Sequence, residues 1–390
     1  MKFNVNPSGR VRKRLGGVAL LSAACIAAAL AIGAPLTQVV PRELDLLLLP
    51  SSQTSHGERR LLLQASQAGS RIVAVGEGGL ILRSEDGGQG WKQVTAPSSV
   101  MLTAVTFVDE RSGWVVGHDG LILHTADGGQ TWQRQFDGRQ ANEQVLASAQ
   151  RRLQELRSRP AASEDAQRNL ARAQDRLAEA EELTQVGPSR PLLGVAFVDA
   201  KVGYAAGSFG QLLATRDGGA HWESIGDRLD NPNGYHLNGI AVASNGDLLV
   251  AAEAGTVFRS TDGGRAWKAI ELGYAGHIYG VLALPGGAVR IAYGFNGHLF
   301  RSEDGGERWA PVRAPVAHTL VHGMVKDGII WLLAQNGELL RSDDAGRTFT
   351  AAGRVPGENV NHFLAVGERL LVAGTQGMTG MNVPVQKVNQ

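Results

Sequence analysis

Six aspartates carry the most repeated side-chain chemistry of this chain, because each stands in a copy, complete in five cases, of the phrase S/T-x-D-G-G-x-x-W. Such a carboxylate can accept hydrogen bonds from backbone N–H groups of its own turn, and the glycines supply the positive φ angles of a tight hairpin. The Trp adds a large apolar surface for packing. We therefore interpret these residues as structural turn residues: Asp86, Asp127, Asp217, Asp262, Asp304 and Asp344.

A second turn, [GA]-x-x-G, ends seven residues before each of these aspartates and carries polar or aromatic side chains. Side chains in or near these turns could bind a peptide, a small ligand or a metal, or they could bind only water and neighbouring backbone. No local cluster of His and Asp with the spacing of a metal site occurs there, so we predict neither a metal nor a cofactor. The predicted partner-binding residues are Glu77, His118, Asp119, Phe209, His236, His277, Tyr279, Phe295, His322 and His362.

Four arginines share one repeated position, three residues before an aspartate of the phrase. Side chains at one structural position could form a basic arc that binds protein. The alternative is that each guanidinium stacks on a Trp or pairs with an acid of its own hairpin. The residues of this candidate arc are Arg83, Arg259, Arg301 and Arg341.

The spacing of the aspartates predicts the elements that position all these residues. Successive gaps are 41, 90, 45, 42 and 40 residues, and about 40–45 residues is the period of a four-stranded propeller blade. Short apolar runs bounded by Gly and Asp are typical of strands. A further [GA]-x-x-G turn, Gly374–Gly377, follows without an Asp phrase. The pattern predicts an all-β fold, a seven-bladed β-propeller over residues 43–390.

The double gap holds an insertion, residues 139–187, in which apolar residues recur at heptad spacing from Leu146 to Leu156 and from Ala166 to Ala180. Pro160 separates the two arms, and Ser163 is a predicted N-cap. We expect a coiled-coil-like helical hairpin between blades two and three. It should emerge on the same face as the [GA]-x-x-G turns. Its apolar stripe either pairs with itself or docks a partner.

The N-terminus has the order of a targeting signal, in which Arg10, Arg12, Lys13 and Arg14 precede an uncharged stretch over 15–34. Residues 1–36 are therefore a signal peptide or a membrane anchor, and both remain open. A lipoprotein site at Cys25 fits less well, because apolar residues continue past it. We predict a periplasmic protein, either free or anchored to the inner membrane through 15–34.

Charge argues against nucleic acid as a partner. The whole chain has a formal net charge of +1, with 38 basic and 37 acidic groups. Five of the basic groups and none of the acidic ones lie in residues 1–14, so the remainder is mildly acidic. A mildly acidic exported body is a poor match for a phosphate backbone.

The six Asp phrases resemble the Asp-box, or BNR, repeats of sialidase-type propellers. The run from Gly113 to Trp132, G-W-V-V-G-x-x-G-x-I-L-x-T-x-D-G-G-x-T-W, resembles more closely the seven-bladed photosystem II assembly and stability factor family. The likeness covers residues 60–380 or so, apart from the insertion. It implies a scaffold that assists assembly or stability of a membrane protein complex, with an arginine patch as a protein-binding surface. Similar propellers of non-photosynthetic bacteria suggest an RND-type exporter as the leading partner.

The alternative functions are a sialidase-like glycoside hydrolase and a periplasmic ligand-binding propeller. A sialidase needs an arginine cluster, a Tyr nucleophile with a Glu partner, and a separate acid. The F/Y-R-I-P phrase of that family is absent, and among five tyrosines only Tyr274 has a nearby Glu, Glu271. G-x-S-x-G, P-loop and Cys/His nucleophile motifs are also absent. We therefore predict that the protein is not an enzyme and has no catalytic residues.

Closure of the ring is the last expectation. Only 13 residues follow Gly377, enough for a third strand of blade seven but not a fourth. The segment Glu43–Leu49 (E-L-D-L-L-L-L) is strand-like and precedes blade one. We predict that it completes blade seven, since closing the ring removes open strand edges.

Overall fold

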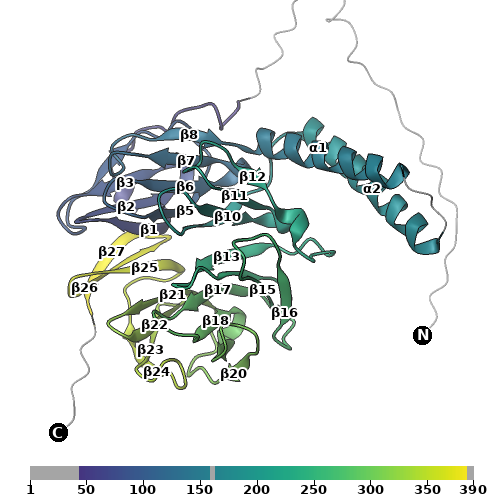
Figure 1. Ribbon diagram of the computed structural model, residues 1–390. Coiled ribbons are helices and arrows are strands. Elements are labelled where there is room, and N and C mark those ends of the chain that lie inside the picture. The colour runs from purple at the N-terminus through teal and green to yellow at the C-terminus, as the bar shows by residue number, and fades with distance from the viewer. Residues whose placement is uncertain (1–43, 159–162, 384–390) are drawn as a thin grey trace, which may run out of the picture. The chain divides into compact units, whose positions relative to one another are not determined.

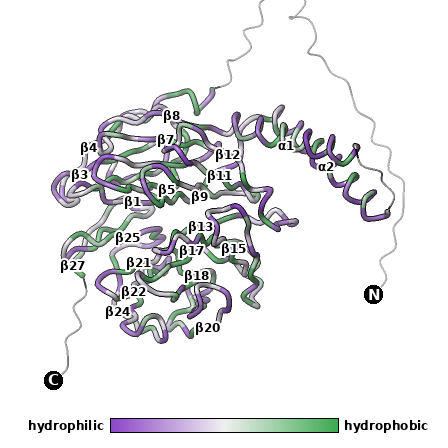
Figure 2. Tube along the Cα trace, viewed as in Figure 1, coloured by the Kyte–Doolittle hydropathy of each residue, from purple (hydrophilic) through white to green (hydrophobic). Residues whose placement is uncertain are grey.

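The computed structural model describes residues 44–158 and 163–383, so the predicted signal or anchor segment lies outside the described residues. The described chain forms seven antiparallel sheets, six with four strands and one with three (Figure 1). Apolar stretches follow the strands, whereas the two helices are mixed in hydropathy (Figure 2). The predicted all-β propeller fold is confirmed.

Every blade runs in sequence order from an innermost strand to an outer one. Blade one contains β1 (Leu62–Ala68), β2 (Arg71–Gly76), β3 (Ile81–Ser84) and β4 (Lys92–Val94). Blade two contains β5 (Leu102–Phe107), β6 (Gly113–Gly117), β7 (Ile122–Thr125) and β8 (Gln133–Phe136). Blade three contains β9 (Leu192–Phe197), β10 (Gly203–Gly207), β11 (Leu212–Thr215) and β12 (Glu223–Ser224). Blade four contains β13 (Leu237–Val242), β14 (Leu248–Ala252), β15 (Thr256–Ser260) and β16 (Lys268–Glu271).

The remaining three blades complete the ring. Blade five contains β17 (Ile278–Ala283), β18 (Arg290–Gly294), β19 (Leu299–Ser302) and β20 (Ala310–Val312). Blade six contains β21 (Leu320–Lys326), β22 (Ile329–Ala334), β23 (Glu338–Ser342) and β24 (Thr350–Arg354). Blade seven contains β25 (Val360–Val366), β26 (Arg369–Gly374) and β27 (Gly377–Asn382). Each innermost strand contacts that of the next blade, and β25 contacts β1.

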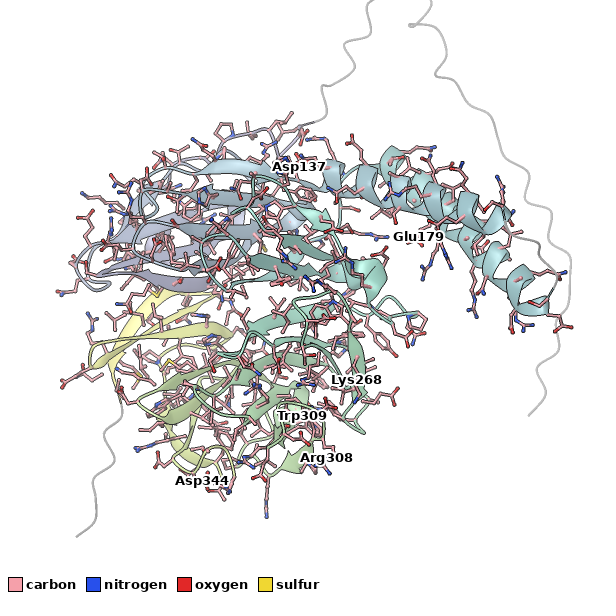
Figure 3. All side chains as sticks on the ribbon, viewed as in Figure 1. Asp137, Glu179, Lys268, Arg308, Trp309 and Asp344 are labelled. Carbon is pink, nitrogen blue, oxygen red and sulfur yellow. The ribbon has the colours of Figure 1, made fainter. Side chains whose placement is uncertain are left out.

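The Asp turns join the third and fourth strands of six blades. In the first, the Asp86 carboxylate accepts hydrogen bonds from the backbone N–H groups of Gln89 (3.0 Å) and Gly90 (2.8 Å) and from the Ser84 hydroxyl (2.8 Å). The backbone N–H and the side chain of His221 lower the pKa of Asp217 to about 2 in the equivalent turn. Asp344 marks the last of these turns in Figure 3.

Two helices occupy the predicted insertion, α1 (Gly138–Arg157) and α2 (Glu164–Val186), and they pair with each other. Asp137 caps α1 (Figure 3). Ser163 caps α2 by accepting a hydrogen bond from the backbone N–H of Ala166. In the part of the chain that the structure describes, no helix is both long and apolar enough to span a bilayer. We call this helix pair the arm.

The base of the arm is part of the propeller core. Ala141 is buried in the cluster that joins blades two and three. The Gln144 side chain donates to the carbonyl of Trp222 (2.7 Å) and accepts from the backbone N–H of Ser224 (2.8 Å). Removal of the base of the arm would therefore remove these contacts with the propeller, whereas removal of its outer part would not.

We expect a variant in which residues 146–179 are replaced by a short Gly/Ser linker to fold with an unchanged unfolding midpoint, because each blade packs mainly on its neighbours. A variant lacking 141–184 should be less stable by about 2 kcal/mol, because it also loses Ala141 and the Gln144 hydrogen bonds. Urea unfolding of both variants beside the unaltered protein measures the difference. Equal destabilisation of the two would show that the outer arm supports the propeller.

The prediction that residues 43–49 complete blade seven is wrong. The described part of this segment forms a turn, in which the backbone N–H of Leu48 donates to the carbonyl of Asp45 (3.0 Å). Leu47 is buried with residues of blades one and two, and the carbonyl of Leu46 accepts from the backbone N–H of Ser99 (2.9 Å). An apolar crevice between two blades thus takes up Leu47 more favourably than a strand edge would.

Blade seven closes on blade one by other contacts. The Asn361 side chain in β25 donates to the carbonyl of Leu62 in β1 (3.2 Å). The short helix η1 (Gly57–Arg59) contacts β27, and a Cβ at Gly377 would lie 2.0 Å from the carbonyl oxygen of Glu58. Within the described residues, the ring is closed by strand packing and by this turn, and β27 is the outermost strand of its blade.

Candidate functional site

One face of the propeller gathers the [GA]-x-x-G turns, and we call this face the rim. Because neighbouring strands are antiparallel, the turns between second and third strands and the connections between blades share one face, whereas the Asp turns lie on the other. The arm and the Leu47 turn, which belong to or pack on such connections, are therefore also at the rim. The rim turns of the first five blades are η2 (Glu77–Gly79), η3 (His118–Gly120), η4 (Ser208–Gly210), 253–255 and η6 (Phe295–Gly297).

The central residue of each of these five turns has a left-handed backbone. In η2 this residue is Gly78, but in η4 it is Phe209, with φ of 55°. A bulky residue with positive φ is uncommon, and such strain costs on the order of 1–3 kcal/mol. The Phe209 side chain is also 56% exposed. Neither burial nor backbone preference explains a Phe at this position, which points to a role in binding.

Glu253 stands at the centre of the rim over blades three to five. One carboxylate oxygen accepts from the backbone N–H of His236 (2.9 Å), and the other lies 3.3 Å from Nδ1 of His277. Burial, and then the Glu253 charge, raise the pKa of Tyr279. Since the Glu253 side chain is 25% exposed, this negative charge can be reached from solvent.

Three exposed aromatic rings lie beside the two imidazoles that flank that carboxylate. Phe209 contacts the ring of His236 edge-on at a centroid distance of 4.7 Å, and the rings of Tyr279 and Phe295 lie 6.2 and 6.5 Å from that of His277. Tyr279 and Phe295 are 36% and 41% exposed. We call this group the aromatic patch: Phe209, His236, Glu253, His277, Tyr279 and Phe295.

Arg190 links the patch to the arm, although no sequence signal distinguished it. Its guanidinium lies over the Phe209 ring, 5.3 Å from the centroid. It also pairs with Glu179 of α2 at 2.9 Å (Figure 3). Arg190 stands in the connection that leads from the arm into blade three, so only the folded ring places it between the two.

Three other predicted residues lie on the rim but over blades one and two. Glu77 pairs with Arg60 at 2.8 Å. His118 is exposed. Burial raises the pKa of Asp119; the nearby charge of Asp45 adds to this effect, and that of His118 opposes it. The structure therefore brings five of the predicted residues into one patch with Glu253 and leaves Glu77, His118 and Asp119 outside it.

His362 is buried and His322 is half-buried, so neither is an exposed residue of the rim surface. Their ring centroids are 3.8 Å apart between β21 and β25, and Nδ1 of each is buried without a hydrogen-bond partner among the described atoms. Burial lowers the pKa of His322 to about 3 and that of His362 well below its usual value. A bulge at Val321 and another at Asn361 shift the alternation by one residue, which turns both histidines inward.

The four arginines of the candidate arc are largely buried, and their donors are used within the ring. Arg83 donates to the carbonyl of Gly128 (3.1 Å) in the Asp turn of the next blade, and Arg301 donates likewise to Ala345 (2.8 Å). Arg259 pairs with Asp247 at 3.0 Å, and Arg341 pairs with its own hairpin and lies over a Trp ring. The contacts of Arg83 and Arg301 tie adjacent blades together, whereas those of Arg259 and Arg341 named here lie within one blade. The four side chains are thus used within the ring, and the arc is not part of the candidate site.

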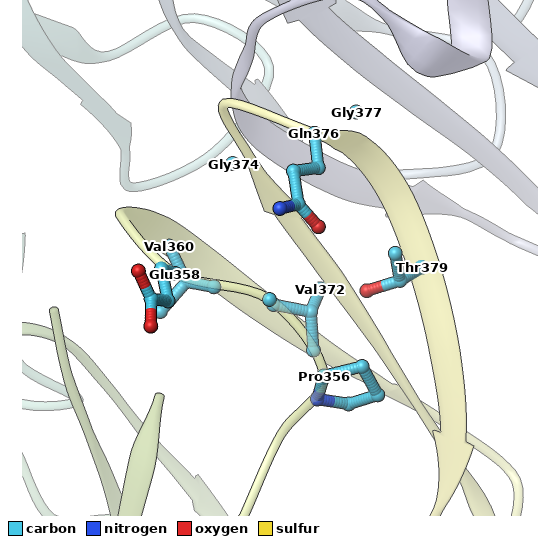
Figure 4. Close-up of a pocket in the computed structure, with 9 residues that line it drawn as sticks. Pro356, Glu358, Val360, Val372, Gly374, Gln376, Gly377 and Thr379 are labelled. Carbon is cyan, nitrogen blue, oxygen red and sulfur yellow. The ribbon is translucent and has the colours of Figure 1, made fainter. Parts of the chain in front are cut away.

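The structure contains a small cavity in blade seven, shown in Figure 4. Its volume is about 10 Å³, close to the space of one water molecule, and it is lined by residues that include Pro356, Val372 and Thr379. Across residues 44–158 and 163–383, no group of three or more His, Cys, Asp or Glu side chains is placed to bind a metal. The aromatic patch is therefore the candidate functional site.

The closed ring of seven sheets and the repeated Asp turns define a seven-bladed β-propeller of the BNR-repeat class. The chain belongs to the family described as "Photosynthesis system II assembly factor YCF48", whose sequence profile matches residues 63–149 and 175–327. The predicted resemblance to this family is confirmed. The unmatched stretch between the two ranges falls within the arm, so the arm lies partly outside what the family shares.

Individual relatives agree with this assignment. The photosystem II assembly lipoprotein Ycf48 of Synechococcus sp. (strain CC9902) is 36% identical over 91 residues, which are 23% of this chain and 25% of that relative. The chain thus matches about a quarter of the length of this curated relative.

Two solved structures show the same fold. One is YCF48 bound to a D1 peptide, with a TM-score of 0.58, 18% identity, and coverage of 84% of this chain and 94% of that one. The other is YCF48 from Cyanidioschyzon merolae, with a TM-score of 0.57, 17% identity, and coverage of 84% and 96%. At these identities the likeness concerns architecture.

Proposed function

We propose that this protein is an exported, non-catalytic scaffold that assists assembly or stability of an inner-membrane protein complex. Its aromatic patch binds an exposed segment of that complex. The observation that carries the proposal is the patch itself, in which three exposed aromatic rings lie beside the two imidazoles that flank a carboxylate, and one ring belongs to a residue with a strained backbone. Exposed aromatic residues around a polar centre are typical of protein-binding surfaces.

Membership of the assembly-factor family supports a scaffold role. The relative from Synechococcus is named an assembly lipoprotein, and the similar YCF48 structure holds a D1 peptide. We extend the role, but not those partners, to this chain. An RND-type exporter is the leading partner, and this choice rests on the resemblance of the sequence to propellers of non-photosynthetic bacteria.

The position of the rim supports a site near the membrane surface. Leu46, Leu48 and Leu49 are exposed at the rim beside the buried Leu47. Only 11 residues separate Ala34, the end of the predicted anchor segment, from Leu46. A fully extended chain of that length spans about 40 Å at most. If residues 15–34 are retained in the membrane, the rim stays within that reach of the bilayer surface.

The test is capture of a membrane partner by the full-length protein from detergent-solubilised membranes of its own cells. We expect Phe209→Ala with Phe295→Ala to reduce recovery of a specific membrane protein at least tenfold with an unchanged unfolding midpoint, because both rings are exposed. The matched control, Gln89→Ala with Gln130→Ala, alters two exposed residues of the Asp-turn face. Equal recovery with both double variants, or glycoside hydrolysis by the purified protein, would contradict the proposal.

A further inference from the structure

The geometry of the aromatic patch points to the chemistry of its ligand, and this inference rests on the function proposed above. We propose that the patch recognises a basic side chain, lysine or arginine, presented by an extended segment of the partner with apolar residues on either side. The Glu253 carboxylate receives the positive charge, while Phe209, Tyr279 and Phe295 cover the apolar neighbours.

The charge of Glu253 lacks a strong partner of its own. Within the described residues, neither a lysine nor an arginine lies within 4.0 Å of its carboxylate, and its ionic neighbours are the imidazoles of His236 and His277. One oxygen accepts a backbone N–H at 2.9 Å, which fixes the orientation of the carboxylate without neutralising it. A partly buried carboxylate held in this way gains free energy when a cation with N–H donors approaches.

The corresponding acid in blade one is different. Glu77 and Glu253 both open a rim turn, directly after a second strand. Glu77 is already paired with Arg60 at 2.8 Å and stands apart from the exposed aromatic rings. The two blades therefore provide a matched pair of glutamates. The charge of Glu77 is paired within the protein, whereas that of Glu253 is available to a ligand.

The aromatic neighbours favour a cation over other ligands. The faces of aromatic rings attract ammonium and guanidinium groups within about 6 Å of the ring centroid. Phe209 already shows this behaviour, since the guanidinium of Arg190 lies 5.3 Å from its centroid. The same rings can cover aliphatic carbons of lysine or arginine, whose stems are apolar. An acidic segment or an anionic lipid headgroup would instead be repelled by Glu253.

The experiment measures binding of fluorescent heptapeptides to the full-length protein by polarisation. The probes have the sequence Ala-Leu-Ala-X-Ala-Leu-Ala, blocked at both ends, with lysine, arginine, norleucine or glutamate at X. We expect the lysine and arginine probes to bind about tenfold more tightly than the norleucine probe, the gain of one charge-assisted contact. Glu253→Gln should remove this preference, whereas Glu77→Gln should leave it unchanged.

Two results would overturn the inference. One is equal binding of lysine and norleucine probes, and the other is a preference that persists in Glu253→Gln. Binding to vesicles of phosphatidylcholine with phosphatidylglycerol that does not depend on Glu253 would assign the aromatic rings to a lipid surface instead. If Phe209→Ala with Phe295→Ala abolishes partner capture but Glu253→Gln does not, the scaffold function stands and the cation preference fails. If neither variant affects capture, both fail.

Discussion

Acid should destabilise this protein through His322 and His362, with a loss of about 2–4 kcal/mol between pH 6.5 and pH 4.5. Nδ1 of each imidazole is buried between blades six and seven, and burial lowers the pKa of His322 to about 3. In the unfolded chain an imidazole takes up a proton below about pH 6.5. Between these two values the unfolded state binds more protons than the folded state, so the free energy of unfolding falls as pH falls.

Denaturant unfolding at pH 7.5, 5.5 and 4.5 measures this effect. The variant His322→Leu with His362→Leu removes both groups and should lose less stability on acidification than the unaltered protein. Carboxylates titrate in every variant, so the comparison isolates the histidines. His118→Leu, which alters an exposed imidazole, is the matched control and should keep the full acid dependence. If the double variant keeps the full pH dependence, the two histidines bind the same number of protons in the folded and unfolded states. That result would contradict the prediction.

Trp114→Ala should cost about 3–5 kcal/mol of unfolding free energy, the range for deletion of a buried aromatic side chain. Trp114 is 1% exposed and stacks on Phe197 of blade three, with ring centroids 3.6 Å apart and planes inclined by 14°. Its indole N–H donates to the carbonyl of Gly218 in the Asp turn of that blade (3.3 Å). The side chain thus joins blades two and three.

Trp114→Tyr is the informative comparison, because the equivalent position of blade three holds Tyr204, whose hydroxyl donates to the carbonyl of Gly263 in blade four (2.9 Å). A tyrosine at 114 should keep the stacking and lose roughly half as much stability as the alanine. Midpoints and slopes from urea unfolding give both values. A loss below about 1 kcal/mol for Trp114→Ala would contradict the packing described for this interface.

Local chemistry explains why the blades were predictable from sequence. Each Asp turn is made by bonds within five residues, as at Ser84, Asp86 and Gly90, so the phrase fixes a hairpin wherever it occurs. The arm was predictable for a similar reason, since Ser163 and the heptad spacing act within one helix. The [GA]-x-x-G turns then assign their residues to one face.

Ring closure and side-chain orientation depend on contacts between distant residues. Leu47 lies in a crevice between blades one and two, and the strand-like run of leucines does not distinguish that crevice from a sheet edge. The orientation of His322 depends on a bulge at Val321, which recurs at the same place in the first strand of every blade and is set by the pairing of whole strands. Glu253 becomes the centre of a site only because blades three and five place Phe209 and Phe295 beside it.

The central claim is that the rim faces a membrane partner, and crosslinking in living cells tests it most directly. A photoreactive amino acid would replace Phe209 in one strain, and Gln130, on the Asp-turn face, in a control strain. The account predicts that the probe at position 209 crosslinks to a defined inner-membrane protein and that the probe at position 130 does not. Equal labelling from both positions, or a product at position 130 alone, would contradict it.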